Sequence, residues 1–276
     1  MEYGDKHILV LGAGASGIGA SWVLAQVGAH VVLNDYKPVT LPVDEEKRLV
    51  STGVDIITGR QDESLLDGVD RIVISPGISL DIPIVKAAQA RGIDVVSEVE
   101  VAYELSKSPI VAVTGTNGKT TTTTLLTKVL EGTGKPVRVG GNIGDSLSEV
   151  AYSMPADGFL VAELSSYQLE TIKHFRPIGA IMLNITPDHL ARHKTMENYI
   201  AAKERIFENQ LSTDFMVLNI DDPIVADMKH RAPSHILEIS QHQVVSNGAY
   251  YDKGQCYVTK NGIATPVRSE ERRVGK

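Results

Sequence analysis

Short apolar runs recur along the chain, and polar or glycine-containing turns separate them. Each run has the length of one buried strand, and several segments between them repeat apolar residues at the i, i+3, i+4 spacing of a helix. Strands that alternate with helices in this way predict an α/β protein with mostly parallel sheets. We expect strands at residues 7–11, 31–35, 54–58, 71–74, 94–96, 110–113, 136–139, 158–162, 178–185, 215–219 and 235–239, and a β-hairpin over 248–259. We expect helices at residues 18–27, 45–51, 84–91, 99–105, 119–130 and 196–207.

A glycine-rich turn follows the first predicted strand. Residues 12–17 read G-x-G-x-x-G and precede a helix, and Asp35 ends the second strand. In a Rossmann unit such a turn binds a pyrophosphate at the helix N-terminus, and the acidic residue binds a ribose hydroxyl. Taken alone, the pattern does not distinguish a dinucleotide from another phosphate-bearing ligand, or from a turn that only packs helix against strand. The turn at 75–78 also follows a strand, so we expect it to face the same crevice.

A second phosphate-binding pattern occupies residues 109–126, which read PIVAVTGTNGKTTTTTLL. A strand, a glycine-containing turn and a Lys-Thr-Thr sequence at a helix start predict a P-loop-type site for nucleotide phosphates. Lys119 can reach the β- and γ-phosphates, and the Thr120 hydroxyl can bind Mg²⁺. The general P-loop has four residues before its Gly-Lys pair, whereas only two separate Gly115 from Gly118. We favour the phosphate site over an ordinary turn with a surface lysine.

Three further residues fit a metal or phosphate site in the same part of the chain. Glu163 ends a buried strand, where its carboxylate can bind Mg²⁺. His189 follows another strand, and we favour a role at the metal or phosphate over a structural one. Lys203 lies on the apolar face of the helix at 196–207, so it either extends to solvent or is buried with a lowered pKa. A buried neutral amine could take up CO₂ as a carbamate and bind a metal, and helical spacing leaves both possibilities open.

The composition narrows the class of protein. The 276 residues carry a net charge of −7 without a long basic block, which argues against nucleic-acid binding. No apolar run approaches the ~20 residues that span a bilayer, the chain starts with a strand and not a signal peptide, and Cys256 is the only cysteine. We expect a cytoplasmic monomer without a membrane partner. Its predicted parts are a Rossmann-like domain at 1–106, a P-loop-type α/β domain at 107–268 and a disordered tail at 269–276.

Eight motifs follow one another in an order that one known family shares. They are GAGASG, NDYKP, ISPGI, VTGTNGKTTT, GGNIG, ELSSYQLE, NITPDH and NYIAAKERIF. In these motifs, from residue 7 to about 260, the chain resembles the Mur ligase family, and most closely its D-glutamate-adding branch. Asn117, the SPGI turn and the G-x-G-x-x-G start distinguish it from the other branches. The resemblance identifies GTNGKTT as the family's own phosphate loop, which accounts for its short spacing.

The resemblance implies an ATP-dependent, amide-forming ligase of peptidoglycan precursor synthesis, which adds D-glutamate to UDP-N-acetylmuramoyl-L-alanine through an acyl phosphate. ATP would bind to Gly115, Thr116, Asn117, Gly118, Lys119, Thr120 and Thr121. The pyrophosphate of the substrate would bind to Gly14, Ala15, Ser16 and Gly17. Asp35, Tyr36 and Lys37 would lie near the uridine, and Gly77 would line the cleft. The muramoyl end would contact Asn142, Ser165 and Gln168. Of two Mg²⁺ ions, Thr120 and Glu163 would bind one, and His189 and a carbamylated Lys203 the other. The resemblance gives catalytic roles to Lys119, His189 and Lys203.

Two features depart from the family. Ala191 stands where the family usually has an aspartate, and we expect the family's third domain, which contacts D-glutamate, to be absent. We therefore expect a truncated ligase that binds the UDP-sugar and forms little amide. Two other classes of function stay open, an NAD-dependent oxidoreductase and a non-catalytic nucleotide-binding module. We also expect the two glycine-rich loops to face one gap between the domains.

Overall fold

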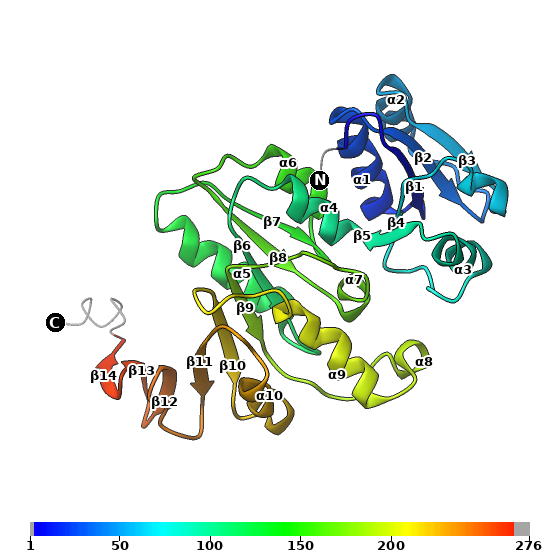
Figure 1. Cartoon of the computed structure of the whole chain (residues 1–276). Coiled ribbons are helices and arrows are strands. Elements are labelled where there is room, and N and C mark those ends of the chain that lie inside the picture. Colours follow the sequence, from blue (N-terminus) through cyan, green and yellow to red (C-terminus); the bar gives the residue numbers. More distant parts are fainter. Residues whose placement is uncertain (1–2, 268–276) are drawn as a thin grey trace.

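A five-stranded parallel sheet forms the N-terminal part of the molecule (Figure 1). The structure is a computed structural model and describes residues 3–267. The strand order β3-β2-β1-β4-β5 is that of a Rossmann unit. The strands are β1 (His7–Leu11), β2 (His30–Asp35), β3 (Asp55–Thr58), β4 (Arg71–Ile74) and β5 (Asp94–Ser97). The connecting helices are α1 (Ala15–Gln26), α2 (Val43–Ser51), the 3₁₀ turn η1 (Glu63–Leu66) and α3 (Pro83–Ala90).

The central strand β1 explains why this part of the sequence reads as an unbroken apolar run. Ile8 and Val10 point into one buried cluster, and Leu9 and Leu11 point into another on the opposite face of the sheet. Successive side chains of a strand alternate between its two faces, and helices cover both faces of a parallel sheet. Every position of β1 after His7 is therefore apolar and buried.

Helix α4 (Glu98–Leu105) joins the two parts of the molecule. Val101 packs into a core of the N-terminal sheet, whereas Val99 and Ala102 pack into the core of the second sheet. Residues 106–109 then lead directly into β6. One short helix thus contributes to both hydrophobic cores, and its two faces fix how the two sheets are joined.

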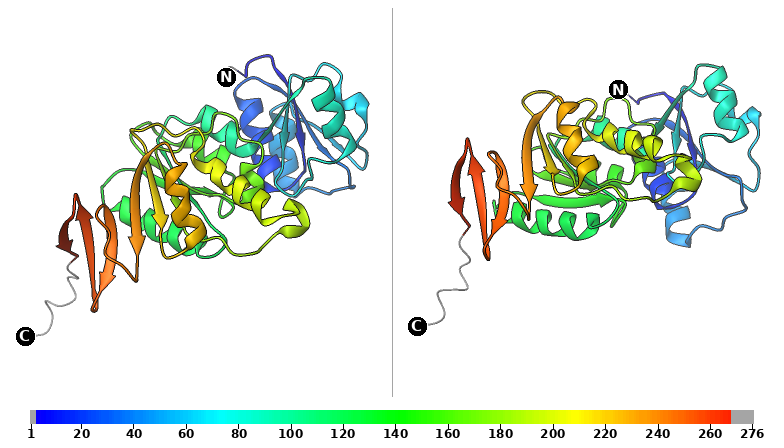
Figure 2. Two further views of the ribbon diagram at one scale, coloured as in Figure 1. Left: turned by 60° about the horizontal axis from the view of Figure 1, so that its bottom comes forward. Right: turned by 90° about the horizontal axis from the view of Figure 1, so that it is seen from below.

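The second sheet has nine strands in the order β14-β13-β12-β11-β10-β9-β6-β8-β7. It is parallel from β7 to β12 and antiparallel from β12 to β14. Its strands are β6 (Ile110–Thr114), β7 (Val137–Gly141), β8 (Phe159–Glu163), β9 (Gly179–Met182), β10 (Phe215–Asn219), β11 (His235–Ser240), β12 (Gly248–Asp252), β13 (Gln255–Lys260) and β14 (Ile263–Pro266). Figure 2 shows β12–β14 at the end of the molecule that lies farthest from the N-terminal sheet.

The helices of this second part differ greatly in length. They are α5 (Lys119–Glu131), α6 (Leu147–Ser153), α7 (Ser166–Leu169), α8 (Leu190–His193), α9 (Met196–Glu204) and α10 (Pro223–Asp227), with 3₁₀ turns η2 (Arg205–Phe207) and η3 (Met228–His230). Within residues 3–267, no helix combines the length and the apolar character that crossing a membrane would need.

The predicted α/β class with mostly parallel sheets is confirmed, and three local predictions need correction. The strand expected over 178–185 ends at Met182, because the next residues bond to the phosphate loop and to β10 instead of extending the ladder. The helix expected over 196–207 finishes as a 3₁₀ turn, and the hairpin carries a third strand, β14. Helices α6, α7 and α8 were not predicted. The tail expected at 269–276 lies outside the described residues.

Candidate functional site

The loop at 115–118, which we predicted to bind phosphate, connects β6 to α5. Gly115 has φ 151° and Gly118 has φ 84°, which are values that residues with a side chain rarely adopt. A Cβ atom on Gly115 would also lie 3.0 Å from the Cβ of Leu183. The two glycines are therefore required by the turn, and the N-terminus of the 13-residue helix α5 follows directly.

Residues from a neighbouring loop and from α9 hold this turn in place. The Asn117 N–H donates to Oδ1 of Asn184 (2.8 Å), and Nδ2 of Asn184 donates to the Asn117 carbonyl (2.9 Å). The Thr116 and Tyr199 hydroxyls share a hydrogen bond of 3.0 Å. Sequence reasoning missed Asn184 and Tyr199, although both lie in motifs that carry the family resemblance. The conformation of the phosphate loop thus depends on residues about 70 to 80 positions away in the chain.

Lys119 folds back over the loop that precedes it. Its Nζ donates to the carbonyls of Gly115 (3.0 Å) and Thr116 (2.9 Å). Thr120 and Thr121 follow in the first turn of α5, and both side chains are exposed. This part of the predicted ATP-binding set therefore forms one continuous surface at the start of the helix.

Lys203 also bonds to this loop and is only 2% exposed. Its Nζ donates to the Gly115 carbonyl (2.8 Å) and to Oγ1 of Thr114 (3.4 Å), and it lies 5.0 Å from the centre of the Tyr199 ring. Burial, together with the nearby charge of Lys119, lowers the pKa of Lys203 from 10.5 to about 7. The possibility that Lys203 extends to solvent is thereby excluded.

Glu163 ends β8, which pairs with β6 so that Glu163 stands beside Val113, just before the loop. The carboxylate is 1% exposed, and its Oε1 accepts a hydrogen bond from Nδ2 of Asn142 (2.8 Å). Its Oε2 is buried, and no atom of residues 3–267 forms a hydrogen bond with it. An unpaired, buried carboxylate oxygen is costly unless a cation or a donor completes it, so the residue fits a site for Mg²⁺.

His189 lies farther from the sheet, at the start of α8. It has φ 54°, and its Nε2 lies 3.4 Å from the Asp188 carboxylate. The ring packs against Tyr167 at a centroid distance of 4.9 Å and against Tyr199 at 6.3 Å. Tyr199 therefore contacts both His189 and Lys203. Within residues 3–267, no hydrogen bond or ion pair joins the predicted metal ligands Thr120, Glu163, His189 and Lys203 to one another.

His193 is buried beside Tyr167 and Tyr199, and we predicted no role for it from the sequence. Its Nε2 is 2.9 Å from the Ser166 hydroxyl, and its ring lies between Tyr167 and Tyr199. Burial lowers the pKa of His193 below its usual value, so the ring is neutral at pH 7. Ala191 is exposed in the same short helix.

Two of the residues predicted to hold the muramoyl end, Ser165 and Gln168, bond to each other. They form a capping box at the start of α7, with the Ser165 N–H donating to Oε1 of Gln168 (2.9 Å). Gln168 is buried, whereas Ser165 is partly exposed. The third such residue, Asn142, bonds to Glu163, so this predicted group lies next to the metal candidate.

The N-terminal glycine-rich turn also requires its glycines. Gly12 has φ 100°, and a Cβ on Gly17 would lie 1.8 Å from the Gly12 carbonyl oxygen. The Asp35 carboxylate accepts hydrogen bonds from the backbone N–H of Ala13 (3.0 Å) and of Lys37 (2.9 Å). Asp35 thus holds the turn in shape. Gly14 caps α1, and Ala15 and Ser16 begin that helix.

A cavity of about 650 Å³ lies beside this turn. Four of the residues predicted to bind the nucleotide sugar line it, and they are Asp35, Tyr36, Lys37 and Gly77. Gln61 also lines the cavity, and its Nε2 donates to Oδ1 of Asn34 (2.9 Å). Sequence reasoning missed Gln61, because it lies in an irregular segment without a motif.

A second cavity, of about 610 Å³, lies at the carboxyl ends of β10 and β11. Its lining includes Asn219, Asp221, Ser240 and Tyr250, and the sequence analysis predicted none of these four as a binding residue. Strands β10, β9 and β6 are parallel neighbours, so this cavity opens at the same edge of the sheet as the phosphate loop.

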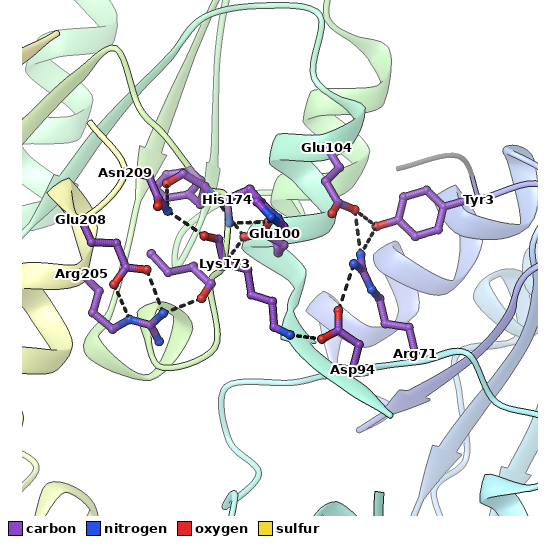
Figure 3. Close-up of polar contacts among 12 residues, drawn as sticks. Tyr3, Arg71, Asp94, Glu100, Glu104, Lys173, His174, Arg205, Glu208 and Asn209 are labelled. Atoms are coloured by element: carbon purple, nitrogen blue, oxygen red, sulfur yellow. Dashed lines mark hydrogen bonds and ion pairs between the residues drawn. The ribbon is translucent and has the colours of Figure 1, made fainter. Parts of the chain in front are cut away.

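A cluster of possible metal ligands away from these loops has another explanation. Oxygen or nitrogen atoms of Glu100, Glu104 and His174 lie within 4.8 Å of one another. Figure 3 shows that Glu104 instead faces Arg71, which donates to it at 2.8 Å. Glu100 accepts from the backbone N–H groups of Lys173 and His174, both at 2.7 Å. These carboxylates already have donors, so they join parts of the fold and offer no open metal site.

The two glycine-rich loops are connected through side chains. The Ser16 hydroxyl lies beside the Glu98 carboxylate, which accepts a hydrogen bond from Ser146. Ser146 follows the loop at 140–144, from which Asn142 reaches Glu163 beside the second phosphate loop. A line of contacts thus runs from one loop to the other.

Comparison with known proteins agrees with this geometry. Residues 6–97 match the family described as "Mur ligase MurD-like, N-terminal domain", and residues 113–272 match "Mur ligase middle domain". The UDP-N-acetylmuramoylalanine–D-glutamate ligase of Thermoanaerobacter sp. (strain X514) is 45% identical over 267 residues, which are 97% of this chain and 59% of that protein. The ligase of the same name from Halalkalibacterium halodurans is 42% identical over 271 residues, 96% of this chain and 60% of that protein.

Solved structures share the fold at lower sequence identity. UDP-N-acetylmuramate:L-alanyl-gamma-D-glutamyl-meso-diaminopimelate ligase from Neisseria meningitides matches with a TM-score of 0.62 and 20% identity, over 98% of this chain and 90% of that one. A murein peptide ligase from Psychrobacter arcticus matches with a TM-score of 0.57 and 19% identity, over 95% of this chain and 60% of that one. The chain spans about three fifths of the length of the curated relatives. With both its N-terminal and its middle domain matched, the chain belongs to the Mur ligase family.

Proposed function

We propose that this chain forms the nucleotide-sugar-binding and ATP-binding parts of a ligase that joins D-glutamate to UDP-N-acetylmuramoyl-L-alanine. The substrates after which its relatives are named support this choice. The observation that carries the proposal is the edge of the second sheet at β6, where Lys119 and Lys203 meet the Gly115 carbonyl and Glu163 stands on the adjacent strand. We place the reaction in the cytoplasm, because it requires ATP, and expect a monomer to suffice.

The nucleotide sugar would bind along the line of contacts between the two loops. The cavity beside Tyr36 and Gly77 would take the uridine, and the N-terminus of α1 at Ser16 would bind the pyrophosphate. Asn142 and Ser165 would then meet the muramoyl end near Glu163. This path would bring the carboxylate of the substrate's alanine to the second phosphate loop.

ATP would bind along the carboxyl edge of the second sheet. Its phosphates would lie on the loop and helix start at 115–121, with Lys119 turning from the loop carbonyls toward them. We assign the base to the cavity at Asn219 and Tyr250. β10 lies two strands away from β6, about 10 Å at the usual strand spacing, which suits the distance from the phosphates to the base of a nucleotide.

Mg²⁺ fits the residues present. Glu163 supplies a buried oxygen without a partner and Thr120 an exposed hydroxyl, and together they would hold one ion. His189 and Lys203 would hold a second, provided that Lys203 carries a carbamate. A pKa of about 7 leaves much of the Lys203 amine neutral at pH 7, as reaction with CO₂ requires. Bound Mg²⁺ would neutralise charge on the phosphates during transfer.

The proposed reaction has two steps. The alanine carboxylate attacks the γ-phosphorus of ATP, which forms an acyl phosphate and releases ADP. The amine of D-glutamate then attacks the carbonyl carbon, and phosphate leaves as the amide forms. In this chain Lys119 would contribute positive charge near the transferred phosphoryl group, and the loops would hold the two reactants in line. We expect the chain by itself to bind the UDP-sugar and to form little amide.

Direct binding measurements separate this proposal from the two rivals. Titration of the chain with UDP-N-acetylmuramoyl-L-alanine and, separately, with NADH should give saturable binding only for the nucleotide sugar. Saturable NADH binding at similar concentrations would favour an oxidoreductase instead. A non-catalytic module would bind the sugar and ATP but would show no substrate-dependent formation of ADP, even when a large excess of protein allows slow turnover to be detected.

A further inference from the structure

The side chain of Glu98, the first residue of α4, is completely buried at the junction of the two domains. Its Oε1 accepts three hydrogen bonds, from the Ser146 hydroxyl (2.6 Å), the Ser148 N–H (2.9 Å) and the Ser148 hydroxyl (3.0 Å). Three donors on one oxygen are more than helix capping alone requires. Both serines belong to the start of α6, so one carboxylate oxygen fixes where that helix begins.

The other side of Glu98 faces the N-terminal domain. The Ser16 hydroxyl, in the G-x-G-x-x-G turn, lies beside the carboxylate, whereas Oε2 is buried without a hydrogen bond of normal geometry. Burial raises the pKa of Glu98, which favours the neutral acid over a buried charge. Glu98 therefore lies between the G-x-G-x-x-G turn, where it neighbours Ser16, and the loop at 140–144, which Ser146 follows.

Helix α1 packs so closely on this group that a side chain is excluded. A Cβ atom on Gly19 would lie 2.1 Å from Oγ of Ser146. Arg48 of α2 reaches across to Glu149 of α6 at 2.5 Å, and Trp22 of α1 packs edge-on against Tyr152 of α6 at 5.9 Å. The start of α6 is thus held by both domains at once.

The loop that precedes α6 carries Asn142, the partner of Glu163. Its position follows from β7 on one side and from Ser146 on the other, because only four residues, 142–145, separate the strand from the serine. A change at Glu98 would release Ser146 and with it the loop, although Glu98 lies outside both predicted binding sets.

We propose that Glu98 is a positioning residue, which sets the loop at 140–144 against the G-x-G-x-x-G turn so that one nucleotide sugar can contact both. This inference rests on the proposed function for its ligand. It assigns Glu98 no contact with the substrate. It requires that the gain in affinity of UDP-N-acetylmuramoyl-L-alanine over UDP depends on the Glu98 carboxylate.

The test compares the dissociation constants of UDP and of UDP-N-acetylmuramoyl-L-alanine in variants of the chain. Glu98→Ala removes the acceptor for Ser146 and Ser148, and we expect the preference for the full substrate over UDP to fall about tenfold, as loss of hydrogen bonds to one buried carboxyl group would do. UDP binding should change less than about twofold, since the three hydrogen bonds that the variant loses come from Ser146 and Ser148 at the start of α6. Glu98→Gln retains an acceptor and should restore most of the preference.

Glu104→Gln is the matched control. Glu104 is a partly buried carboxylate on the same helix, but its partners are Arg71 and Tyr3, in the N-terminal part of the chain (Figure 3). This variant should lower the melting temperature and leave the preference unchanged. An unchanged preference in Glu98→Ala, or an equal loss in Glu104→Gln, would overturn the proposal. If Glu98→Ala does not fold, Ser148→Ala provides a milder version, because it removes the hydroxyl donor and leaves the Ser148 N–H.

Trp22 supplies a readout that needs no ligand. It is the only tryptophan, and it lies where α1 meets α6. Glu98→Ala should shift its emission to longer wavelength and raise its quenching by iodide, whereas Glu98→Gln and Glu104→Gln should not. If the unchanged chain binds neither UDP nor the nucleotide sugar, the proposed function fails. The fluorescence comparison still decides whether Glu98 positions α6, and an unaltered Trp22 spectrum in Glu98→Ala would refute it.

Discussion

The Nζ of Lys203 donates a 2.8 Å hydrogen bond to the carbonyl of Gly115, the first residue of the phosphate loop. Nζ of Lys119 donates to the same carbonyl at 3.0 Å, so two lysines share one acceptor. Lys119 is the first residue of α5, whereas Lys203 belongs to α9, which begins much later in the chain, at Met196. The first carbonyl of the loop is therefore held by two lysines, and the buried Lys203 carries the larger desolvation cost.

Stability should depend on pH through Lys203. Its pKa falls from 10.5 in the unfolded chain to about 7 in the folded one, so between these values the unfolded state binds the additional proton. The free-energy cost of burying the charged Lys203 amine is fully present below pH 7, and it disappears as the pH rises toward 10.5. Lys203→Met should therefore raise the free energy of unfolding more at pH 6 than at pH 9.5, by up to about 3 kcal/mol.

Urea unfolding of both proteins at the two pH values, in CO₂-depleted buffer, measures this difference. Lys128→Met is the control, since Lys128 is exposed on α5 and pairs only with Glu131. Its effect should be the same at both pH values. A Lys203→Met effect that does not change with pH would mean that the folded Lys203 keeps an ordinary pKa.

Tyr199→Phe should weaken ATP binding without removing the ring beneath Lys203. The Tyr199 hydroxyl bonds to Thr116 at 3.0 Å, and its loss frees one side of the phosphate loop. We expect a loss of about 1 kcal/mol in stability, and ATP affinity lower by about fivefold, in calorimetric titrations. Tyr103→Phe is the control, because Tyr103 packs edge-on against Phe175 away from the loop. Equal losses in both variants would contradict a specific role for the Thr116–Tyr199 bond.

Glu163→Gln should abolish the dependence of ATP binding on Mg²⁺ while the fold survives. The amide keeps an oxygen that can accept from Asn142, as Oε1 does now at 2.8 Å, but it replaces the unpaired Oε2 with a nitrogen that cannot bind a cation. ATP affinity measured over a Mg²⁺ series should rise at least about tenfold for the unchanged chain and stay flat for the variant. Glu131→Gln, at the exposed end of α5, should behave like the unchanged chain.

Gly17→Ala should disrupt the N-terminal turn. The added Cβ would lie 1.8 Å from the Gly12 carbonyl oxygen, so the turn or α1 must move. We expect a loss of about 3 kcal/mol in stability, at the upper end for an overpacked site, and a matching loss of UDP binding. Gly4→Ala, where no atom lies within 4 Å of the added Cβ, should leave both quantities unchanged. A Gly17→Ala protein that melts and binds UDP normally would show that the turn accommodates a side chain.

Much of the architecture could be read from the sequence because its signals are local. An apolar run such as Ile110–Thr114 needs only its own residues to be recognised as a buried strand, and the glycines at 115 and 118 mark a turn by their backbone freedom. The same holds for the G-x-G-x-x-G turn and for the acidic residue Asp35. The short helices α6, α7 and α8 escaped because four to seven residues are too few to display a helical period.

The order of residues by itself determined where the candidate groups lie: two glycine-rich loops at strand ends, a Lys-Thr-Thr helix start, and Glu163, His189 and Lys203 as predicted ligands. Only the tertiary structure decided that Lys203 is buried against Gly115, that Asn184 and Tyr199 support the loop, and that Glu98 lies between the domains. Local patterns fix backbone conformation, since each residue responds mainly to its neighbours in sequence. Burial and hydrogen-bond partners depend on which distant segments pack together, and no single stretch of sequence contains that information.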